Sequence, residues 1–485
     1  MIDARRRTLL GLVALAAIGA VLHVWAGYTA PRPWPDESHF IAPALALIRG
    51  DGLSVPELNA PGGIFWMPTG YYVAQVPLLK VGLDPLAAAR LLSLSGVVIF
   101  AVAVAVTAAR AGVPHPVAFG ACALWLCLPR VVAIANIARM EGLILALAGG
   151  ALWLTARDRW RLALACAWVA PLLHPVGLAV AVTVSGAAVV RTGLPPWRPA
   201  DRIVLGAVAA LWVVQVLYFV ANAEAAAAHL GFQFTRKAQR AISLQWWHWA
   251  LLGVTGAAGL AATVRWRRGT PTSRSIWTLL ALSGAFVLID VLGREMWYEF
   301  LGRETAFLLA ALAGVAAARH ESVGYGTRNR NPAAAAGMSI LMFLAVVGLA
   351  VGTGVAVRQT LTSQWYGMRG AWSSHQEWRA FAGSAVGELQ QLDRAGGPRE
   401  TIVVDPLSGF GQEVFARPWQ RLSFVQPTPA TPLAPGSGDY ILATPGAPFA
   451  TRGLVSLWGS PPPAVEVRSS NGRYLMQLFR RPGDL

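Results

Sequence analysis

The chain has few charged residues, and its basic residues are almost all of one kind. Only 13% of the 485 residues are charged, whereas 55% are hydrophobic, a composition that excludes a soluble cytosolic enzyme. Of the 40 basic residues only Lys80 and Lys237 are lysine. The formal net charge is +16, but the arginines are scattered over many loops. This distribution favours a membrane topology signal over a nucleic-acid-binding patch.

Cysteine is also scarce. Cys122, Cys127 and Cys166 each lie inside an apolar block, where a thiol acts as a small hydrophobic group. Their spacing matches neither a disulfide framework nor a zinc site.

What the chain has in abundance is apolar blocks of the length that a helix needs to cross about 30 Å of hydrocarbon. They predict an α-helical polytopic membrane protein with about 11 transmembrane helices. The expected spans are 9–27, 86–107, 116–129, 142–155, 162–173, 175–190, 203–221, 249–264, 276–292, 305–317 and 333–356. The stretch 160–190 is divided at His174-Pro175, because one long helix there would invert every later loop.

Arginine density gives the orientation. Basic residues are about threefold denser in the loops that share a side with residues 1–8. That side is therefore expected to be cytoplasmic, in the plasma (inner) membrane of a bacterium. Arg5-Arg6-Arg7 before an apolar run also fits a signal peptide, but the run is long for a signal core and the later spans need an uncleaved first anchor.

Two segments on the outer side are too long to be simple connectors, the first outer loop at 28–85 and the segment 357–485. Residues 38–49 have the apolar spacing of a short interfacial helix that ends at Gly50, and a second such helix is expected near Pro68. We expect a transmembrane catalytic domain at 1–356. Residues 357–485, with a helix at 375–394 and short β-like runs at 401–404, 439–443, 464–467 and 474–479, predict a small outer α/β domain.

Acidic residues near membrane depth are costly, so those beside the spans indicate function. Asp36, Glu37, Glu141, Asp290, Glu295, Glu299 and Glu304 are all expected at the outer membrane face, together with Arg90, Arg139, Arg294 and Arg303. Carboxylates and guanidiniums in one cavity would suit an anionic lipid phosphate and a hydroxyl that must lose a proton.

Each of these residues also has a purely structural interpretation. Asp36-Glu37 after a proline can be an N-cap with a first-turn acid. Arg139 and Glu141 can anchor the end of a span, and Arg90 can reach the interface by extending along its own helix. His174 can be a histidine satisfied at a helix break.

A set of ordered motifs resembles one enzyme family. The motifs are Trp34-Pro35-Asp36-Glu37, the helix ending at Gly50, Phe65-Trp66-Met67-Pro68, Ala88-Ala89-Arg90-Leu91, Arg139-Met140-Glu141, Leu173-His174-Pro175 and Gly302-Arg303. In this order they resemble the GT-C membrane glycosyltransferases, which include the protein O-mannosyltransferases and the lipid A aminoarabinose transferases. The resemblance covers roughly residues 1–320 and is specific in the first 100.

The resemblance implies transfer of a sugar from a polyprenyl-phosphate donor to an acceptor hydroxyl of a glycan, lipid or protein at the outer membrane face. Asp36 would be the general base, and Glu37 would orient it or bind the acceptor. Arg303, with Arg90, Arg139 and His174, would hold the lipid phosphate. Glu141 would be a second acidic site and, with Asp36, the carboxylate pair for a divalent cation if the enzyme uses one.

The chain departs from the family at two basic positions. Met67 stands where relatives carry the lysine of a Lys-Pro-Pro motif, and His174 replaces the lysine of Thr-Lys-Gly. Two other functions remain open. A transporter would be expected to show paired repeats and ionisable groups near span centres, and a lipid-linked glycan polymerase or ligase would depend on arginines in late outer loops.

Overall fold

The computed structural model describes residues 2–19, 36–190, 198–238, 271–292, 298–324, 368–405, 410–427, 433, 437–443, 458 and 461–482. The expected spans at 249–264 and 333–356 lie outside these ranges, as do Arg294 and Glu295.

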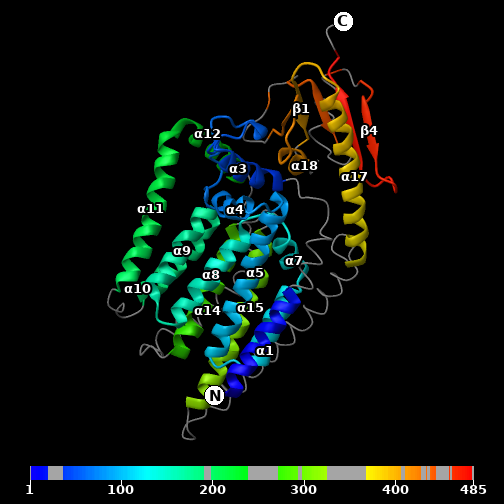
Figure 1. The fold of residues 1–485 in the computed structure, drawn as a ribbon. Helices are drawn as coiled ribbons and strands as arrows, with labels where there is room; N and C mark the ends of the chain where they lie inside the picture. Colours follow the sequence, from blue (N-terminus) through cyan, green and yellow to red (C-terminus); the bar gives the residue numbers. More distant parts are fainter. Residues whose placement is uncertain are drawn as a thin grey trace.

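Helices form a bundle below a small sheet (Figure 1). Every expected span within the described residues coincides with or overlaps a helix. The bundle contains α1 (Ile2–Gly19), α5 (Pro85–Arg110), α6 (His115–Leu126), α7 (Pro129–Ala135), α8 (Glu141–Ala156), α9 (Trp160–Leu173), α10 (Leu178–Val190), α11 (Pro199–Ala221), α12 (Ala223–Ala238), α14 (Pro271–Leu292) and α15 (Tyr298–Gly324). Among the described helices α5 and α11 are long and apolar enough to cross a membrane, and four further apolar stretches are shorter. The expected total of eleven spans stays a prediction.

Two short helices close one end of the bundle, α3 (Glu37–Arg49) and α4 (Gly70–Lys80). Gly50 ends α3 with φ +87°, a left-handed conformation that glycine adopts without a steric penalty. We call this the α3–α4 end. At the opposite end Trp160, Ala187 and Trp277 pack together, and Arg274 pairs with Asp158 at 3.3 Å. Helix α14 therefore starts at the opposite end and runs toward α3 and α4.

The helix break expected at His174-Pro175 is confirmed. Helix α9 ends at Leu173, and a 3₁₀ turn, η3 (Pro175–Gly177), precedes α10. A Cβ on Gly177 would lie 2.4 Å from the Ala170 carbonyl carbon, so only glycine permits the chain to turn this tightly against α9.

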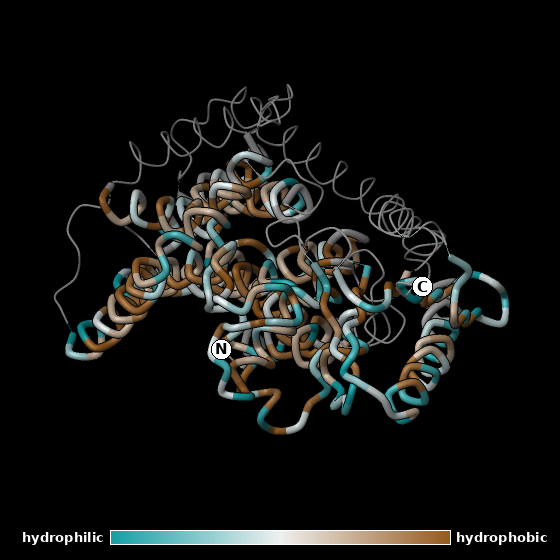
Figure 2. The backbone as a smooth tube through the Cα atoms, turned by 90° about the horizontal axis from the view of Figure 1, so that it is seen from above, coloured by the Kyte–Doolittle hydropathy of each residue, from teal (hydrophilic) through white to brown (hydrophobic). Residues whose placement is uncertain are grey.

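Helix α11 stands at the edge of the bundle. Half of the most apolar 18-residue stretch of α5 is buried in the protein, whereas only 11% of the corresponding stretch of α11 is buried. In Figure 2, which looks down from the α3–α4 end, α11 lies apart on the left, and hydrophobic residues predominate along it as they do along the bundle helices. An apolar helix with so little burial in protein is suited to contact with lipid.

The C-terminal segment forms the small α/β unit expected from the sequence. Helix α17 (Met368–Arg394) runs beside a sheet of β1 (Glu400–Val404), β2 (Leu422–Val425), β3 (Tyr440–Ala443), β4 (Val465–Arg468) and β5 (Leu475–Arg480), with α18 (Gly411–Phe415) between β1 and β2 (Figure 1). The strand order is β2-β1-β3-β5-β4, and β1 pairs in parallel with both β2 and β3. Strand β2 was not predicted, because its alternation of apolar and polar residues extends over only four residues between polar flanks.

Candidate active site

Asp36 lies at the first turn of α3, with its side chain 45% exposed. It occupies the N-cap position, but its side chain makes no capping hydrogen bond. The N-cap interpretation of Asp36 therefore does not hold, and its carboxylate remains accessible to a ligand.

Glu37, by contrast, is fully buried. Its two carboxylate oxygens accept hydrogen bonds of 2.9 Å from Nε and Nη2 of Arg90 on α5, and Oε1 also accepts one of 2.7 Å from the Ala138 amide. The Arg90 side chain is only 11% exposed. Such a bidentate pair fixes both geometry and charge, so it fastens the start of α3 to α5 and to the turn before α8.

Arg139 lies between the two other acids of this end. Its Nη2 is 2.9 Å from Glu141 Oε1 and its Nη1 is 3.8 Å from Asp36 Oδ2. The guanidinium also lies over the Phe40 ring, 5.6 Å from its centroid. Arg139 thus brings Asp36 and Glu141 into one charged group, as expected from the sequence.

The backbone at Arg139 is held by close packing of α5 against α8. The Ser93 hydroxyl donates to the Arg139 carbonyl at 2.6 Å, and the Arg139 amide lies 3.2 Å from the same hydroxyl oxygen. A Cβ on Gly142 would lie 2.2 Å from the Ser93 carbonyl oxygen. Sequence reasoning missed the roles of Ser93 and Gly142, although each lies within two residues of a motif that carried the resemblance.

Arg303 lies at a similar depth on the α14–α15 hairpin. Its neighbour Gly302 packs directly on Asp290, and Phe286, one turn before Asp290, contacts Phe100 on α5. Four residues of an α-helix rise about 6 Å. Asp290, four residues after Phe286, is therefore level with Gly96, four residues before Phe100 on α5, and Gly96 packs against Gly142. Arg303 is half-buried, as is Glu304. Glu299 is in α15, but its side chain lies outside the described part.

His174 lies farther along the same end, at the α9–η3 break. Its Nδ1 accepts a hydrogen bond from the Val176 amide at 3.2 Å, and α4 packs beside it, since a Cβ on Gly70 would lie 2.6 Å from the Leu172 carbonyl oxygen. This contact matches the structural interpretation of His174, and its assignment to the lipid phosphate stays a prediction.

The pair Asp36 and Glu141 is poorly suited to a divalent cation. The Arg139 guanidinium is within ion-pair distance of both carboxylates and already compensates their charge. The described residues also contain no group of three or more His, Cys, Asp or Glu side chains with metal-ligand geometry, whereas Mg²⁺ and Ca²⁺ require six or more oxygen ligands. We derive no step that involves a metal.

Aromatic and histidine side chains border Asp36. His39 lies one turn farther along α3, its ring centroid 6.5 Å from that of Trp66. His229 of α12 lies 5.5 Å beyond Trp66 and accepts a hydrogen bond from the Phe65 amide at 3.3 Å. Burial lowers the pKa of His39 below its ordinary value although the Asp36 charge acts to raise it. These rings, which the sequence analysis did not select, form a row that begins at His39, one turn from the exposed carboxylate.

The C-terminal unit also reaches this region. The backbone amide of Gln426, directly after β2, donates to the Glu57 carbonyl at 2.7 Å, and Gly411 of α18 packs against Ser38. The start of α3 is therefore covered by residues from the far end of the chain, a contact that no local pattern could have indicated.

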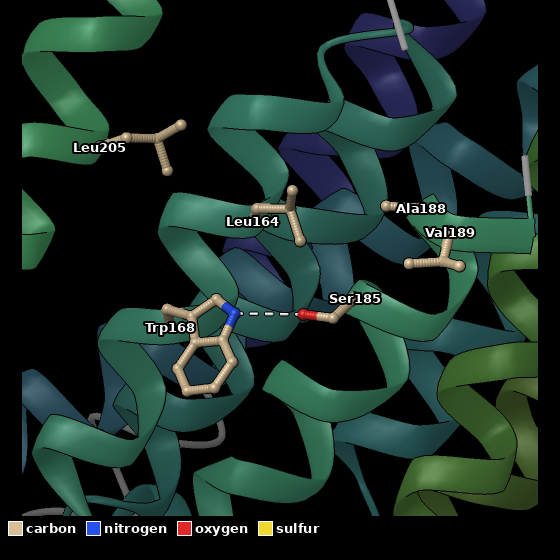
Figure 3. Close-up of a pocket in the computed structure, with 6 residues that line it drawn as sticks. All are labelled: Leu164, Trp168, Ser185, Ala188, Val189 and Leu205. Atoms are coloured by element: carbon tan, nitrogen blue, oxygen red, sulfur yellow. Dashed lines mark hydrogen bonds between the residues drawn. The ribbon is translucent and has the colours of Figure 1, made fainter. Parts of the chain in front are cut away.

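A separate apolar groove lies between α9, α10 and α11, with a cavity volume of about 330 Å³. Figure 3 shows its lining residues, Leu164, Trp168, Ser185, Ala188, Val189 and Leu205, with the Trp168 indole donating to the Ser185 hydroxyl at 3.1 Å. None of these residues is charged, and Leu164, Ala188 and Leu205 belong to the halves of their helices nearer the opposite end. The groove is distinct from the charged group at Asp36.

No protein-family profile and no curated protein matches the chain. Among solved structures, it is similar to ArnT from Cupriavidus metallidurans bound to undecaprenyl phosphate, with 16% identity, 96% of this chain and 97% of that chain covered, and a TM-score of 0.52. The apo state of the same ArnT gives 14% identity, the same coverage and a TM-score of 0.46. An oligosaccharyltransferase from Archaeoglobus fulgidus in the apo form gives 12% identity and a TM-score of 0.42, with 87% of this chain and 65% of that chain covered. The resemblance to GT-C transferases is confirmed at the level of the fold.

Proposed function

We propose that this protein is a membrane glycosyltransferase that moves a sugar from a polyprenyl-phosphate donor to an acceptor hydroxyl. The observation that carries the proposal is the arrangement around Asp36: an exposed carboxylate held beside the buried Arg139–Glu141 pair at one end of a bundle with the fold of ArnT. ArnT itself is described with undecaprenyl phosphate bound, which supports the same donor class here.

The proposed reaction assigns a role to each part of this group. The acceptor oxygen attacks the anomeric carbon while Asp36 takes its proton, and the bond from that carbon to the phosphate oxygen breaks. The polyprenyl phosphate leaves with the electron pair. Arg139 and Arg303 stabilise its negative charge, which is the electrostatic contribution that fixed guanidiniums make in transferases.

Glu37 and Arg90 take positioning roles in this scheme. Their bidentate contact uses both carboxylate oxygens and two nitrogens of the guanidinium, so binding of either residue to a substrate would break the pair. We propose that the pair aligns Asp36, that Glu141 sets the position of Arg139, and that His174 borders the donor site. The accumulation of charge at one end, instead of at the span centres, favours a transferase over a transporter.

The test is Asp36→Asn, which keeps the shape of the side chain but removes its basicity. We expect transfer of labelled sugar from a polyprenyl phosphate in proteoliposomes to fall by roughly 10² to 10⁴, the usual range for a general base. Asp51→Asn is the matched control, since Asp51 lies in the same loop but pairs with Arg49 on the surface. An Asp36→Asn protein with turnover equal to that of the control would refute the assignment.

A further inference from the structure

Gln426 occupies an unusual place for a residue of the C-terminal unit. It follows β2, is 1% exposed, and touches the first turn of α3, from which it is 388 residues distant in the sequence. A polar side chain this deeply buried requires hydrogen-bond partners. Gln426 finds them on Ser38 and His39 of α3, directly after Asp36 and Glu37.

The two polar atoms of the Gln426 side-chain amide contact different residues. Oε1 accepts a hydrogen bond from the Ser38 hydroxyl at 3.0 Å, and Nε2 lies 3.3 Å from Nε2 of His39. The backbone amide donates to Glu57. Two contacts therefore hold the side chain and one holds the backbone, and both side-chain contacts end on the residues that follow Asp36-Glu37 in the chain.

This orientation of the amide favours a neutral His39. Because Oε1 is the acceptor for Ser38, the atom facing His39 is the amide NH₂ group, which can only donate. Nε2 of His39 must then accept and carry no proton, so the neutral ring holds its proton on Nδ1. A protonated His39 would direct an N–H group at the NH₂ group of Gln426. The lowered pKa of His39, caused by burial, agrees with this neutral state.

We infer that Gln426 is a positioning residue of the catalytic site, through which the C-terminal unit holds Ser38 in place and keeps His39 neutral beside Asp36. The inference rests on the proposed function for Asp36. Its consequence is chemical as well as steric: an imidazolium one turn from the base would lower the affinity of the carboxylate for the acceptor proton, whereas a neutral imidazole leaves it unchanged.

Among the described residues, the charged group acting on His39 is Asp36 on its own helix. Titratable groups on the neighbouring elements have other partners: Glu57 of η2 (Pro56–Leu58) pairs with Arg49, Arg139 with Glu141, and Glu413 of α18 with Trp378 and Arg417, while His229 lies beyond Trp66. Gln426 is therefore the contact whose replacement should change the titration of His39.

The experiment compares Gln426→Glu and Gln426→Ala in the full-length protein. A glutamate keeps the shape of the side chain but accepts from His39 Nε2–H, so it should raise the pKa of His39 by about one unit or more. Histidine-labelled NMR spectra give this pKa, with the signal assigned by its loss in His39→Gln. Gln391→Glu, on the exposed surface of α17, adds the same charge elsewhere, and Gln477→Ala, on β5, is the control for truncation.

Activity provides the second measurement. We expect both Gln426→Glu and Gln426→Ala to reduce kcat several-fold, with KM for the lipid donor within about twofold, because the contact positions groups beside the base and does not touch the donor. A glutamate variant whose His39 titration and kcat both match Gln391→Glu overturns the inference.

The outcomes distinguish this inference from the proposed function. The His39 titration does not depend on turnover, so it can succeed or fail by itself. If the wild-type protein transfers no sugar, or Asp36→Asn is fully active, the proposed function fails. If Asp36→Asn is inactive while the Gln426 variants equal their controls, only the positioning role is wrong.

Discussion

The buried residues Glu37 and Arg90 should be strongly coupled in their effect on the stability of the folded protein, and a double-mutant cycle can measure this coupling energy. The perturbation is Glu37→Gln, Arg90→Met and the combination of both. Glu37→Gln leaves the Arg90 guanidinium in place, 11% exposed, without its counter-charge.

The magnitude follows from the contacts. Breaking a buried ion pair by removing one partner costs about 3–5 kcal/mol, because the other charge stays buried and uncompensated. Arg90→Met should cost a similar amount, since Glu37 then keeps only the Ala138 amide among these three bonds. In the double variant neither charge remains, so its cost should fall well below the sum, with a coupling energy of about 2 kcal/mol or more.

The assay is equilibrium unfolding of the purified protein with SDS in mixed micelles, followed by far-UV circular dichroism. Arg49→Met together with Asp51→Asn removes an exposed pair on the same helix and loop, for which we expect a coupling below about 1 kcal/mol. Additive costs for Glu37 and Arg90 would show that the pair does not fasten α3 to α5, and would return Glu37 to a role in acceptor binding.

Three further predictions concern packing, pH dependence and topology. Gly142→Ala should force α5 and α8 apart, because its Cβ would meet the Ser93 carbonyl oxygen at 2.2 Å; we expect about 1–3 kcal/mol of destabilisation, against little change for Gly150→Ala in the same helix, both measured by SDS titration. Burial raises the pKa of Glu413, while Trp378 and arginine neighbours act to lower it. Its net contribution to stability is therefore present at low pH and is lost as pH rises through the raised folded pKa, so Glu413→Gln should increase Tm more at pH 8 than at pH 4, and an equal increase at both would contradict the burial argument. In a protein without its native cysteines, cysteines at exposed positions 51 and 470 should react with a membrane-impermeant reagent in intact cells, and one at position 159 should not; the reverse pattern would invert the topology.

The sequence predicted the helical segments better than it predicted their contacts. Apolar block length located α5, α8, α9 and α11 to within a few residues, and His174-Pro175 marked the break correctly, because span length and proline chemistry are local properties. The pairing of Glu37 with Arg90, 53 residues away, depends on how α3 crosses α5, and no periodicity contains that information.

The candidate site was predictable to a different degree. The resemblance selected Asp36, and the contacts of Arg139 and Glu141 now group these residues around it. The resemblance assigns Arg90 to phosphate binding, and that role stays a prediction. What the structure shows is a buried contact between the Arg90 guanidinium and Glu37. Strand β2 and Gln426 could not be predicted, since their importance arises only when residues 422–426 pack on a loop near the start of the chain.

That packing has a consequence for biosynthesis. The neighbours of Asp36 are synthesised at widely separated times: Ser38, His39 and Glu57 are made early, whereas Gln426 follows Ser38 by 388 residues. Domains fold largely in the order in which the ribosome releases them, so the first loop must wait until the C-terminal unit has been synthesised before it obtains this partner. A nascent chain that lacks residues 422–426 would therefore carry the acid without its finished surroundings, and full activity would begin only after the C-terminal unit has folded.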